Sequence, residues 1–315
     1  GYTKNNLRCI NAVIKISKID HAKKEIDNYN KYVKWYLPYS WRPELLGHAI
    51  GKYFGVICYS FVFNDERPFL PLTELIQRED FSSVQKVIDQ VFGSGYQQWY
   101  HKSNHRKEDN LTQYYFERWF QNRKSPEDDF AKWAIKNGSI TQNTVKIGNL
   151  ETQLPGSYLL ARIRGTYTSC LRHGDLNSNN ILLSSDNYIT FIDFQETGRG
   201  HLFEDFVTFE LSFRQHCNLH LSAEKLLQLE YDLSDNKFVA TSEKIKRWGS
   251  IIKKIRNSAF DNFEGECIYN YYYALALGAY RFFRWPISNW QKKQMGVLLV
   301  TLVNQLTTAD DTANA

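Results

Sequence analysis

The sequence contains few cysteines, little net charge and no long apolar run, and each of these scarcities argues against a class of protein. Its five cysteines are widely spaced, and no two of them form a CxxC pair. Free thiols in a reducing compartment therefore fit better than a disulfide framework or a zinc site. The formal net charge of +5 is spread over both halves of the 315 residues, which does not indicate a nucleic-acid partner.

A recognisable targeting or membrane segment is also missing. No positively charged stretch followed by an apolar one opens the sequence, as a signal peptide would. The most apolar stretch, "YNYYYALALGAYRFF" (269–283), is too short and too rich in tyrosine to span a bilayer. We expect a cytoplasmic protein without a membrane partner. Because the first residue is Gly1 rather than Met, we also expect processing, or a longer parent chain that carries other domains.

The first sixty residues carry the pattern of a small sheet with one helix. Residues 9–17 are apolar and β-branched, which predicts a strand. Residues 21–37 have apolar side chains at helical spacing, which predicts a helix that ends at Pro38. Residues 43–62 are typical of two strands joined by a turn that contains glycine. The sequence therefore predicts a small mixed lobe over residues 1–62.

Helical periodicity dominates the rest of the chain. Thr73 can cap a helix that runs into residues 85–92, and residues 156–170 fit either a helix or a strand. Further helices are expected near 110–123, 203–215, 222–231, 241–259, 264–284 and 290–307. The predicted fold class is α+β, with a large, mainly helical lobe over residues 63–307 and a polar tail over residues 308–315.

Polar side chains cluster in one stretch, "HGDLNSNNILLSSDNYITFIDF" (173–194). Two short strands joined by a turn would set Asn180, at the start of the first, beside Asp193, at the end of the second. Two oxygen ligands in that position suit Mg²⁺, and the nearby Asp175 would be free to orient a hydroxyl group and receive its proton. The plainer interpretation is a hairpin with polar turn residues, but the joint spacing favours a site.

This stretch resembles the catalytic loop and metal-binding segment of the aminoglycoside phosphotransferase-like kinases, the small-molecule branch of the protein-kinase fold. The shared pattern is His-Gly-Asp, an asparagine five residues after the aspartate, and Ile-Asp-Phe after the second strand. The continuation "GRGHLFEDFVTFE" (198–210) resembles bacterial phosphotransferase-like domains, including those called ternary complex associated domains. The resemblance implies a two-lobe kinase-like fold that uses ATP and Mg²⁺.

The resemblance also implies a role for each residue of the motif. Asp175 would be the catalytic aspartate, while Asn180 and Asp193 would hold Mg²⁺ on the phosphates. His173 would support the loop by packing near Phe194. Asp205 would anchor the backbone of the catalytic loop from a helix.

The small lobe should then supply a lysine on a strand and a glutamate on the following helix. Lys15 would contact the phosphates, and Glu25 would fix its ammonium group. The adenine would lie against backbone groups of Ser60, Phe61 and Val62. Only fourteen residues precede Lys15, so the turn that covers the phosphates in the family is expected to be incomplete or to lie further upstream.

Two functions remain open on the sequence alone. The first is an ATP- and Mg²⁺-dependent phosphotransferase that acts on an alcohol group of an unidentified small molecule. The second is a nucleotide-binding regulatory or interaction domain, pseudokinase-like, within a larger multidomain bacterial protein. A protein kinase is not favoured, because no Ala-Pro-Glu segment follows Asp193.

Overall fold

The computed structural model of the chain describes residues 12–60, 69–95, 99–100, 105–161, 164–184, 188–234, 242–261, 263 and 265–313. It divides into two units, and the chain enters the first of them twice. The first unit consists of Gly1–His105 and Cys170–Asp205, and the second consists of Arg106–Ser169 and Phe206–Ala315. The predicted α+β class, with a small sheet-rich N-terminal lobe and a mainly helical C-terminal part, is confirmed. The lobe boundary predicted after residue 62 falls outside the described residues and stays a prediction.

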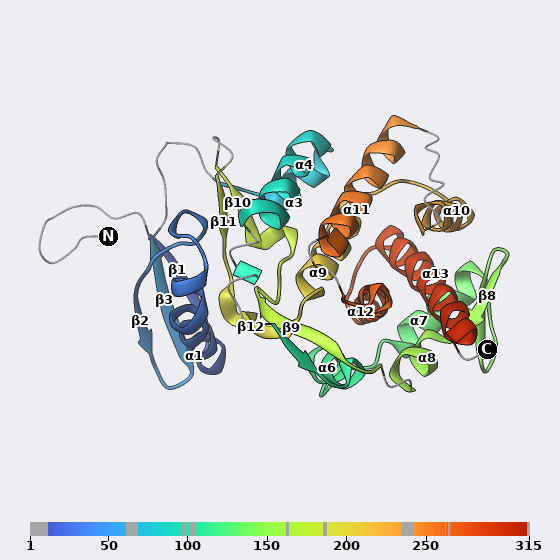
Figure 1. Cartoon of the computed structure of the whole chain (residues 1–315), viewed down its shortest axis with the longest axis horizontal. Helices are drawn as coiled ribbons and strands as arrows, with labels where there is room; N and C mark the ends of the chain where they lie inside the picture. The colour runs from blue at the N-terminus through green and yellow to red at the C-terminus, as the bar shows by residue number, and fades with distance from the viewer. Residues whose placement is uncertain are drawn as a thin grey trace, which may run out of the picture. The chain divides into compact units, whose positions relative to one another are not determined.

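Three antiparallel strands form the N-terminal sheet. In sheet order they are β1 (Ala12–Lys18), β3 (Phe54–Ser60) and β2 (Leu45–Ile50). Helix α1 (Ile19–Asn28) follows β1 directly and lies against this sheet (Figure 1). The strands and the helix predicted for this part of the chain are thus present.

The predicted helix over residues 21–37 has an irregular middle. After α1 the chain makes a π-helical turn over Tyr29–Val33 and continues as α2 (Lys34–Tyr36), ending before Pro38. Residues Ile26, Tyr29, Val33 and Leu37 are buried. These spacings of three and four residues are those predicted from the sequence, so the buried face is continuous through the π-helical turn.

A second small sheet of the first unit carries the polar motif. Strand β10 (Ile181–Leu183) pairs antiparallel with β11 (Ile189–Phe191) and with β4 (Leu70–Pro71). Ile181 lies opposite Phe191, and the amide of Ile192 donates to the carbonyl of Asn180 at 3.1 Å. The predicted hairpin is therefore present, and its register brings residues 180 and 193 to the same end of the two strands.

The helix predicted from Thr73 is two helices, and Thr73 is not a cap. Helix α3 (Leu72–Gln77) ends before Glu79, whose φ is 60°, and α4 (Phe81–Gln90) begins afterwards. The side chain of Asp80 accepts a hydrogen bond from the amide of Ser83 and caps α4. An aspartate followed by serines offers this cap locally, so the chain restarts its helix there.

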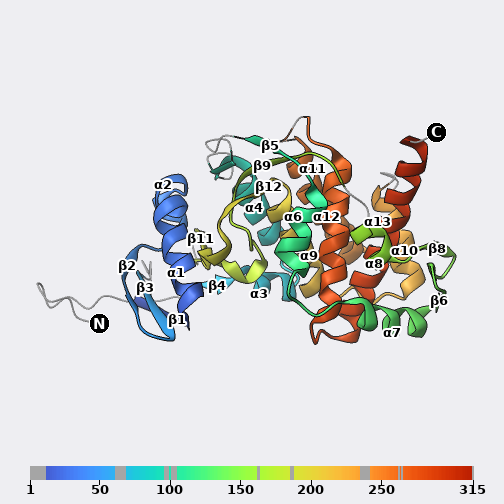
Figure 2. The same cartoon turned by 90° about the horizontal axis from the view of Figure 1, so that it is seen from below.

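The second unit is mainly helical. Its helices α12 and α13 pack against each other (Figure 2). The segment 156–170 contains both of the alternatives left open, since α8 is followed by strand β9. The elements of this unit are β5 (Arg106–Glu108), α6 (Leu111–Tyr115), α7 (Glu127–Asn137), β6 (Ser139–Ile140), β7 (Thr144–Ile147), β8 (Leu150–Gln153), α8 (Pro155–Ala161), α10 (Ala223–Ser234), α11 (Glu243–Asp261), α12 (Ile268–Arg281) and α13 (Asn289–Ala313). Two elements cross the boundary between the units, β9 (Tyr167–Arg172) and α9 (Glu204–His216). The polar tail expected over residues 308–315 is helical as far as Ala313, because α13 continues through it.

Four helices, α9 to α12, contribute to a cluster of buried charges in the second unit. Glu210 of α9 is fully buried and pairs at 2.8 Å with both Arg214 and Arg256. The hydroxyl of Tyr271 donates to the same carboxylate at 2.7 Å, and Arg214 also pairs with Glu230 of α10. A buried charge is tolerated only when it is paired and hydrogen-bonded, and this cluster meets that condition.

No helix within the described ranges is both long enough and apolar enough to cross a membrane.

Candidate active site

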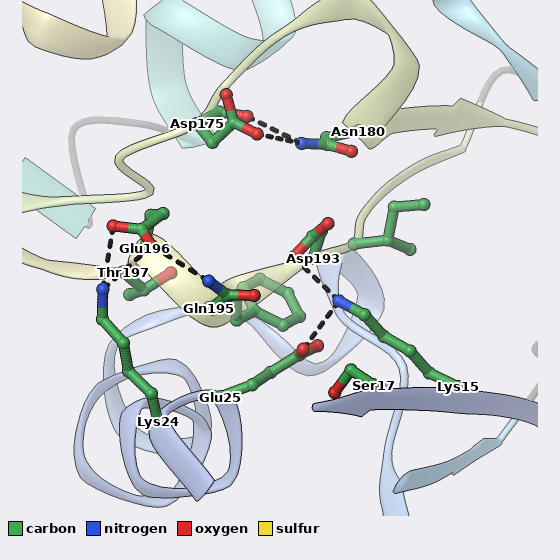
Figure 3. A network of polar contacts seen from close by, with 12 residues as sticks. Lys15, Ser17, Lys24, Glu25, Asp175, Asn180, Asp193, Gln195, Glu196 and Thr197 are labelled. Atoms are coloured by element: carbon green, nitrogen blue, oxygen red, sulfur yellow. Dashed lines mark hydrogen bonds and ion pairs between the residues drawn. The ribbon is translucent and has the colours of Figure 1, made fainter. Parts of the chain in front are cut away.

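Lys15 joins two carboxylates that come from distant parts of the first unit. Its ammonium nitrogen lies 2.6 Å from Oε2 of Glu25 on α1 and 2.9 Å from Oδ1 of Asp193, which follows β11 (Figure 3). The sequence separation between Lys15 and Asp193 is 178 residues. The fold thus brings together three residues that the sequence predicted for one site.

The three groups differ in their exposure to solvent. Glu25 is completely buried, whereas the side chains of Lys15 and Asp193 are 28% and 40% exposed. Burial lowers the pKa of Lys15, but the hydrogen bonds and negative charges of Asp193 and Glu25 outweigh this effect and raise it. Lys15 is therefore a cation at neutral pH. Its side chain remains partly accessible to solvent beside Asp193.

Asn180 and Asp175 form the other edge of the site. The side-chain amide nitrogen of Asn180 donates to the backbone carbonyl of Asp175 at 2.8 Å and to its Oδ2 at 3.2 Å (Figure 3). Because the nitrogen of Asn180 is engaged by Asp175, its side-chain oxygen is the atom left to accept a ligand. The sequence expected Asp175 to lie beside Asn180, and the structure brings these two residues together.

Asp193 has a backbone conformation that residues other than glycine rarely adopt. Its φ and ψ are 64° and 72°, in the left-handed region, which costs a non-glycine residue free energy and is often found at functional sites. The turn that follows, over Phe194–Glu196, is a single 3₁₀ turn. This local geometry turns the chain away from the direction of β11 at Asp193.

The backbone just before Asp175 is held by hydrogen bonds to the side chain of Asp205. Both oxygens of this buried carboxylate accept backbone amides at 2.7 Å, one from His173 and one from Gly174. Tyr100 donates to the same carboxylate at 3.2 Å. Burial raises the pKa of Asp205, while the neighbouring His173 and Arg172 act in the opposite direction. The ring of His173 lies 5.4 Å from that of Phe194, and its Nε2 lies 3.0 Å from the carbonyl oxygen of Ile192.

Helix α1 is attached to the turn that follows Asp193. The side-chain amide of Asn28 donates to the carbonyls of Phe194 and Gln195 at 3.3 and 2.8 Å. One turn earlier, Lys24 pairs with Glu196 at 2.9 Å (Figure 3). The helix that carries Glu25 is therefore bound to the segment that carries Asp193. Nothing in the sequence pattern singled out Lys24, Asn28 or Glu196, which looked like ordinary surface residues.

A cavity of about 310 Å³ opens next to Lys15. That volume is in the range of small-molecule sites. Its lining comes from β1, β3, α1 and the β10–β11 hairpin and is mostly apolar apart from the site residues: Val13, Ile14, Lys15, Glu25, Pro43, Tyr59, Ser60, Phe69, Asn180, Leu182, Thr190, Ile192, Asp193 and Phe194. Ser60, which was expected to contact the adenine, lines this cavity, whereas Phe61 and Val62 fall outside the described residues.

The residues around this cavity suit a divalent cation only in part. In the ranges that the structure describes, no three His, Cys, Asp or Glu side chains come close enough to hold a metal ion by themselves. Asn180 and Asp193 offer two hard oxygen donors. Mg²⁺ is commonly bound by one or two protein oxygens together with substrate phosphates and water. The donor set therefore fits Mg²⁺ that arrives with a phosphate ligand.

One member of the site was missed by the sequence reasoning. The hydroxyl of Tyr59 donates to Oε1 of Glu25 at 3.0 Å, on the side opposite Lys15. Tyr59 belongs to the regular alternation of β3, in which Gly55, Ile57 and Tyr59 are buried. The alternation predicts that its side chain is buried, but nothing in the sequence pairs its hydroxyl with Glu25.

These groups define a class of site: a strand lysine held by a helix glutamate, facing an asparagine and two aspartates beside a cavity. The model of the family described as "Phosphotransferase enzyme family" matches residues 99–216, fewer than half of the chain but including Asp175, Asn180 and Asp193. The match confirms the resemblance to aminoglycoside phosphotransferase-like proteins over this segment, and it supports a phosphotransferase with a kinase-like fold.

Comparison with individual proteins adds little to the family match. No curated protein sequence matches the chain. Among solved structures, a glucosamine kinase in complex with glucosamine, ADP and inorganic phosphate is similar over 94% of this chain and 72% of its own chain, with 9% sequence identity and a TM-score of 0.45.

Proposed function

We propose that the protein transfers the terminal phosphoryl group of ATP, with Mg²⁺, to a hydroxyl group of a small molecule. The observation that carries this proposal is the contact of Lys15 with both Glu25 and Asp193, at a cavity bordered by Asn180. A buried glutamate that fixes a partly exposed lysine presents a cation to an anionic ligand, and in kinases such a pair binds phosphates. The family match over the segment with Asp175 supports the same reaction.

Each residue of the site has a task in this proposal. Lys15 binds phosphate oxygens, and Glu25 holds its ammonium group in place. Asn180 and Asp193 hold the metal ion, which when bound neutralises the negative charge of the phosphates. The apolar part of the cavity, including Val13, takes the flat base of the nucleotide by burying its faces.

Asp175 handles the acceptor in this proposal. Its carboxylate lies beside Asn180, whose side-chain amide donates one hydrogen bond to this carboxylate and one to the backbone carbonyl of Asp175. A restrained carboxylate at this position orients the acceptor hydroxyl group toward the phosphate and accepts its proton during transfer. Positioning and charge neutralisation provide most of the acceleration in phosphoryl transfer, so we expect this set to suffice.

Nucleotide binding is the first test. Calorimetry with ATP and Mg²⁺ should detect binding to the wild-type protein and a loss of at least about tenfold in affinity for Asp193→Asn, which removes a charged metal ligand. Asp27→Asn is a matched control, because Asp27 is an exposed carboxylate on α1. Failure of the wild type to bind would refute the proposal, and equal binding by wild type and Asp193→Asn would refute the metal site.

Turnover is the second test. ADP release should be measured over a panel of sugars, amino alcohols, nucleosides and aminoglycosides, and Asp175→Ala should reduce any turnover by about 10²-fold or more. Asn179→Ala, an exposed neighbour in the same loop, is expected to retain activity. Nucleotide binding without turnover on any acceptor would instead favour the regulatory domain.

A further inference from the structure

Glu25 has two hydrogen-bond partners, and only one of them is the lysine. Within the described ranges its carboxylate accepts from Lys15 through Oε2 at 2.6 Å and from Tyr59 through Oε1 at 3.0 Å. The residue is completely buried, so water does not replace either partner. Both partners are therefore needed to satisfy this carboxylate.

Tyr59 is built to act as a donor. Its side chain is 6% exposed, and its ring packs against that of Tyr29 with the ring centroids 5.8 Å apart. Burial, followed by the charge and hydrogen bond of Glu25, raises the pKa of Tyr59. The hydroxyl therefore stays protonated at neutral pH, and it donates its hydrogen to the carboxylate of Glu25.

The strand register sets Tyr59 and Lys15 on the same face of the sheet. In the pairing of β1 with β3, Lys15 lies opposite Ile57, and Tyr59 is two residues further along β3. Residues two apart on a strand share a face, and α1 packs on that face with Glu25. The carboxylate is thus held between two neighbouring strands, by the lysine of one and the tyrosine of the other.

We propose that Tyr59 is a positioning residue that fixes Glu25, and through it directs the ammonium group of Lys15 toward the phosphates of the nucleotide. This inference rests on the proposed function for its purpose, though the contact itself does not. A glutamate side chain with one partner can rotate about its bonds, whereas a tyrosine held by packing has little freedom. Tyr59 therefore supplies the second fixed point that keeps the Glu25–Lys15 pair in one geometry.

A phenylalanine separates this role from packing. Tyr59→Phe keeps the ring and removes only the hydroxyl, leaving one oxygen of a buried carboxylate without a donor. A ring that acted only by packing would give a variant like the wild type. Tyr29→Phe is the matched control, because Tyr29 is an adjacent buried tyrosine whose hydroxyl donates to the carbonyl of Pro43 and not to Glu25.

The test is a double-mutant cycle between Tyr59→Phe and Glu25→Ala in the full chain, read by calorimetric titration with ATP and Mg²⁺. Tyr59→Phe should weaken binding by about tenfold or more in the wild-type background, which is the lower end of the range for one hydrogen bond to a charged group. In the Glu25→Ala background the same change should have an effect of less than about twofold, because Tyr59 acts through Glu25. Tyr29→Phe should change the affinity by the same factor in both backgrounds.

A second reading of the cycle needs no nucleotide. In urea unfolding, Tyr59→Phe should shift the unfolding constant by about tenfold or more in the wild-type background and much less in the Glu25→Ala background. Equal effects of Tyr59→Phe in both backgrounds, or no effect on nucleotide affinity, would overturn the proposal. If the wild type binds no nucleotide but the unfolding cycle shows the coupling, the proposed function fails while the contact between Tyr59 and Glu25 stands.

Discussion

Replacing Glu210 by glutamine should destabilise the protein strongly at neutral pH and progressively less in acid. Glu210 is buried between Arg214 and Arg256 and also accepts from Tyr271. Glutamine has a similar shape and keeps one acceptor oxygen, but it carries no charge. The substitution therefore leaves two buried guanidinium groups without their shared carboxylate, which is the costly way to break a buried ion pair.

The pKa of Glu210 gives the size of the effect. Burial raises this pKa, but the charges of Arg256 and Arg214 and the hydrogen bonds from Arg256 and Tyr271 outweigh burial and lower it from 4.5 to about 2. A tenfold change in an ionisation constant corresponds to about 1.4 kcal/mol, so the charged form contributes roughly 3 kcal/mol to the free energy of unfolding. Because the folded-state pKa is the lower one, this contribution is present above pH 4.5 and disappears as the pH falls toward 2.

Urea unfolding of wild type and Glu210→Gln between pH 7 and pH 3 tests this reasoning. The two free energies of unfolding should differ by roughly 3 kcal/mol at pH 7 and converge as the pH falls below 4.5. Glu243→Gln is the matched control, because Glu243 pairs with Arg247 at the same four-residue spacing but on the surface. Exposed pairs contribute little, so this control should be indistinguishable from wild type. A difference for Glu210→Gln that stays constant with pH would refute the assignment.

Three further substitutions test the architecture of the candidate site, each by thermal unfolding. Gly174→Ala should be much more destabilising than Gly265→Ala. Both glycines have a φ of 84°, but a Cβ added at Gly174 would lie 2.2 Å from a backbone oxygen, whereas one added at Gly265 would face open space. Asp205→Asn should cost about 1–3 kcal/mol, because an amide nitrogen cannot accept the second backbone N–H. Asn28→Ala should cost about 1 kcal/mol or more through its two lost hydrogen bonds, whereas Asn30→Ala, an exposed neighbour, should be neutral. Equal effects within either pair, or an unchanged Asp205→Asn, would contradict these contacts.

The parts of the fold that follow from local chemistry could be predicted from the sequence. The β10–β11 hairpin follows from two apolar runs separated by turn residues, and its pairing alone brings Asn180 to Asp193. The helix before Pro38 follows from apolar residues at helical spacing that end at a proline. Lys15 and Glu25 entered only through the family resemblance, because a lysine in a strand or a glutamate on a charged helix is unremarkable by itself.

Other features depend on contacts that periodicity does not encode. Thr73 and Asp80 are both good capping residues, but Thr73 instead forms a 2.6 Å hydrogen bond with Ser178, in the loop that carries Asp175. Tyr59 lies on a mainly apolar strand, and no neighbouring residue in the sequence indicates its polar partner. In each case the deciding interaction is made with a residue far away in sequence, so a local pattern cannot reveal it.

The 178-residue separation between Lys15 and Asp193 also bears on how the protein is made. At 5–20 residues per second, the ribosome needs roughly 10 to 35 seconds to add the residues between them. Glu25, ten residues from Lys15, is available almost at once, while the segment with Asp193 arrives only after residues 106–169, which belong to the second unit. The first unit therefore cannot be completed as the chain emerges in order. Strands β1 to β3 are synthesised first, and the cavity beside Lys15 is completed only after the segment with Asp193 has been synthesised.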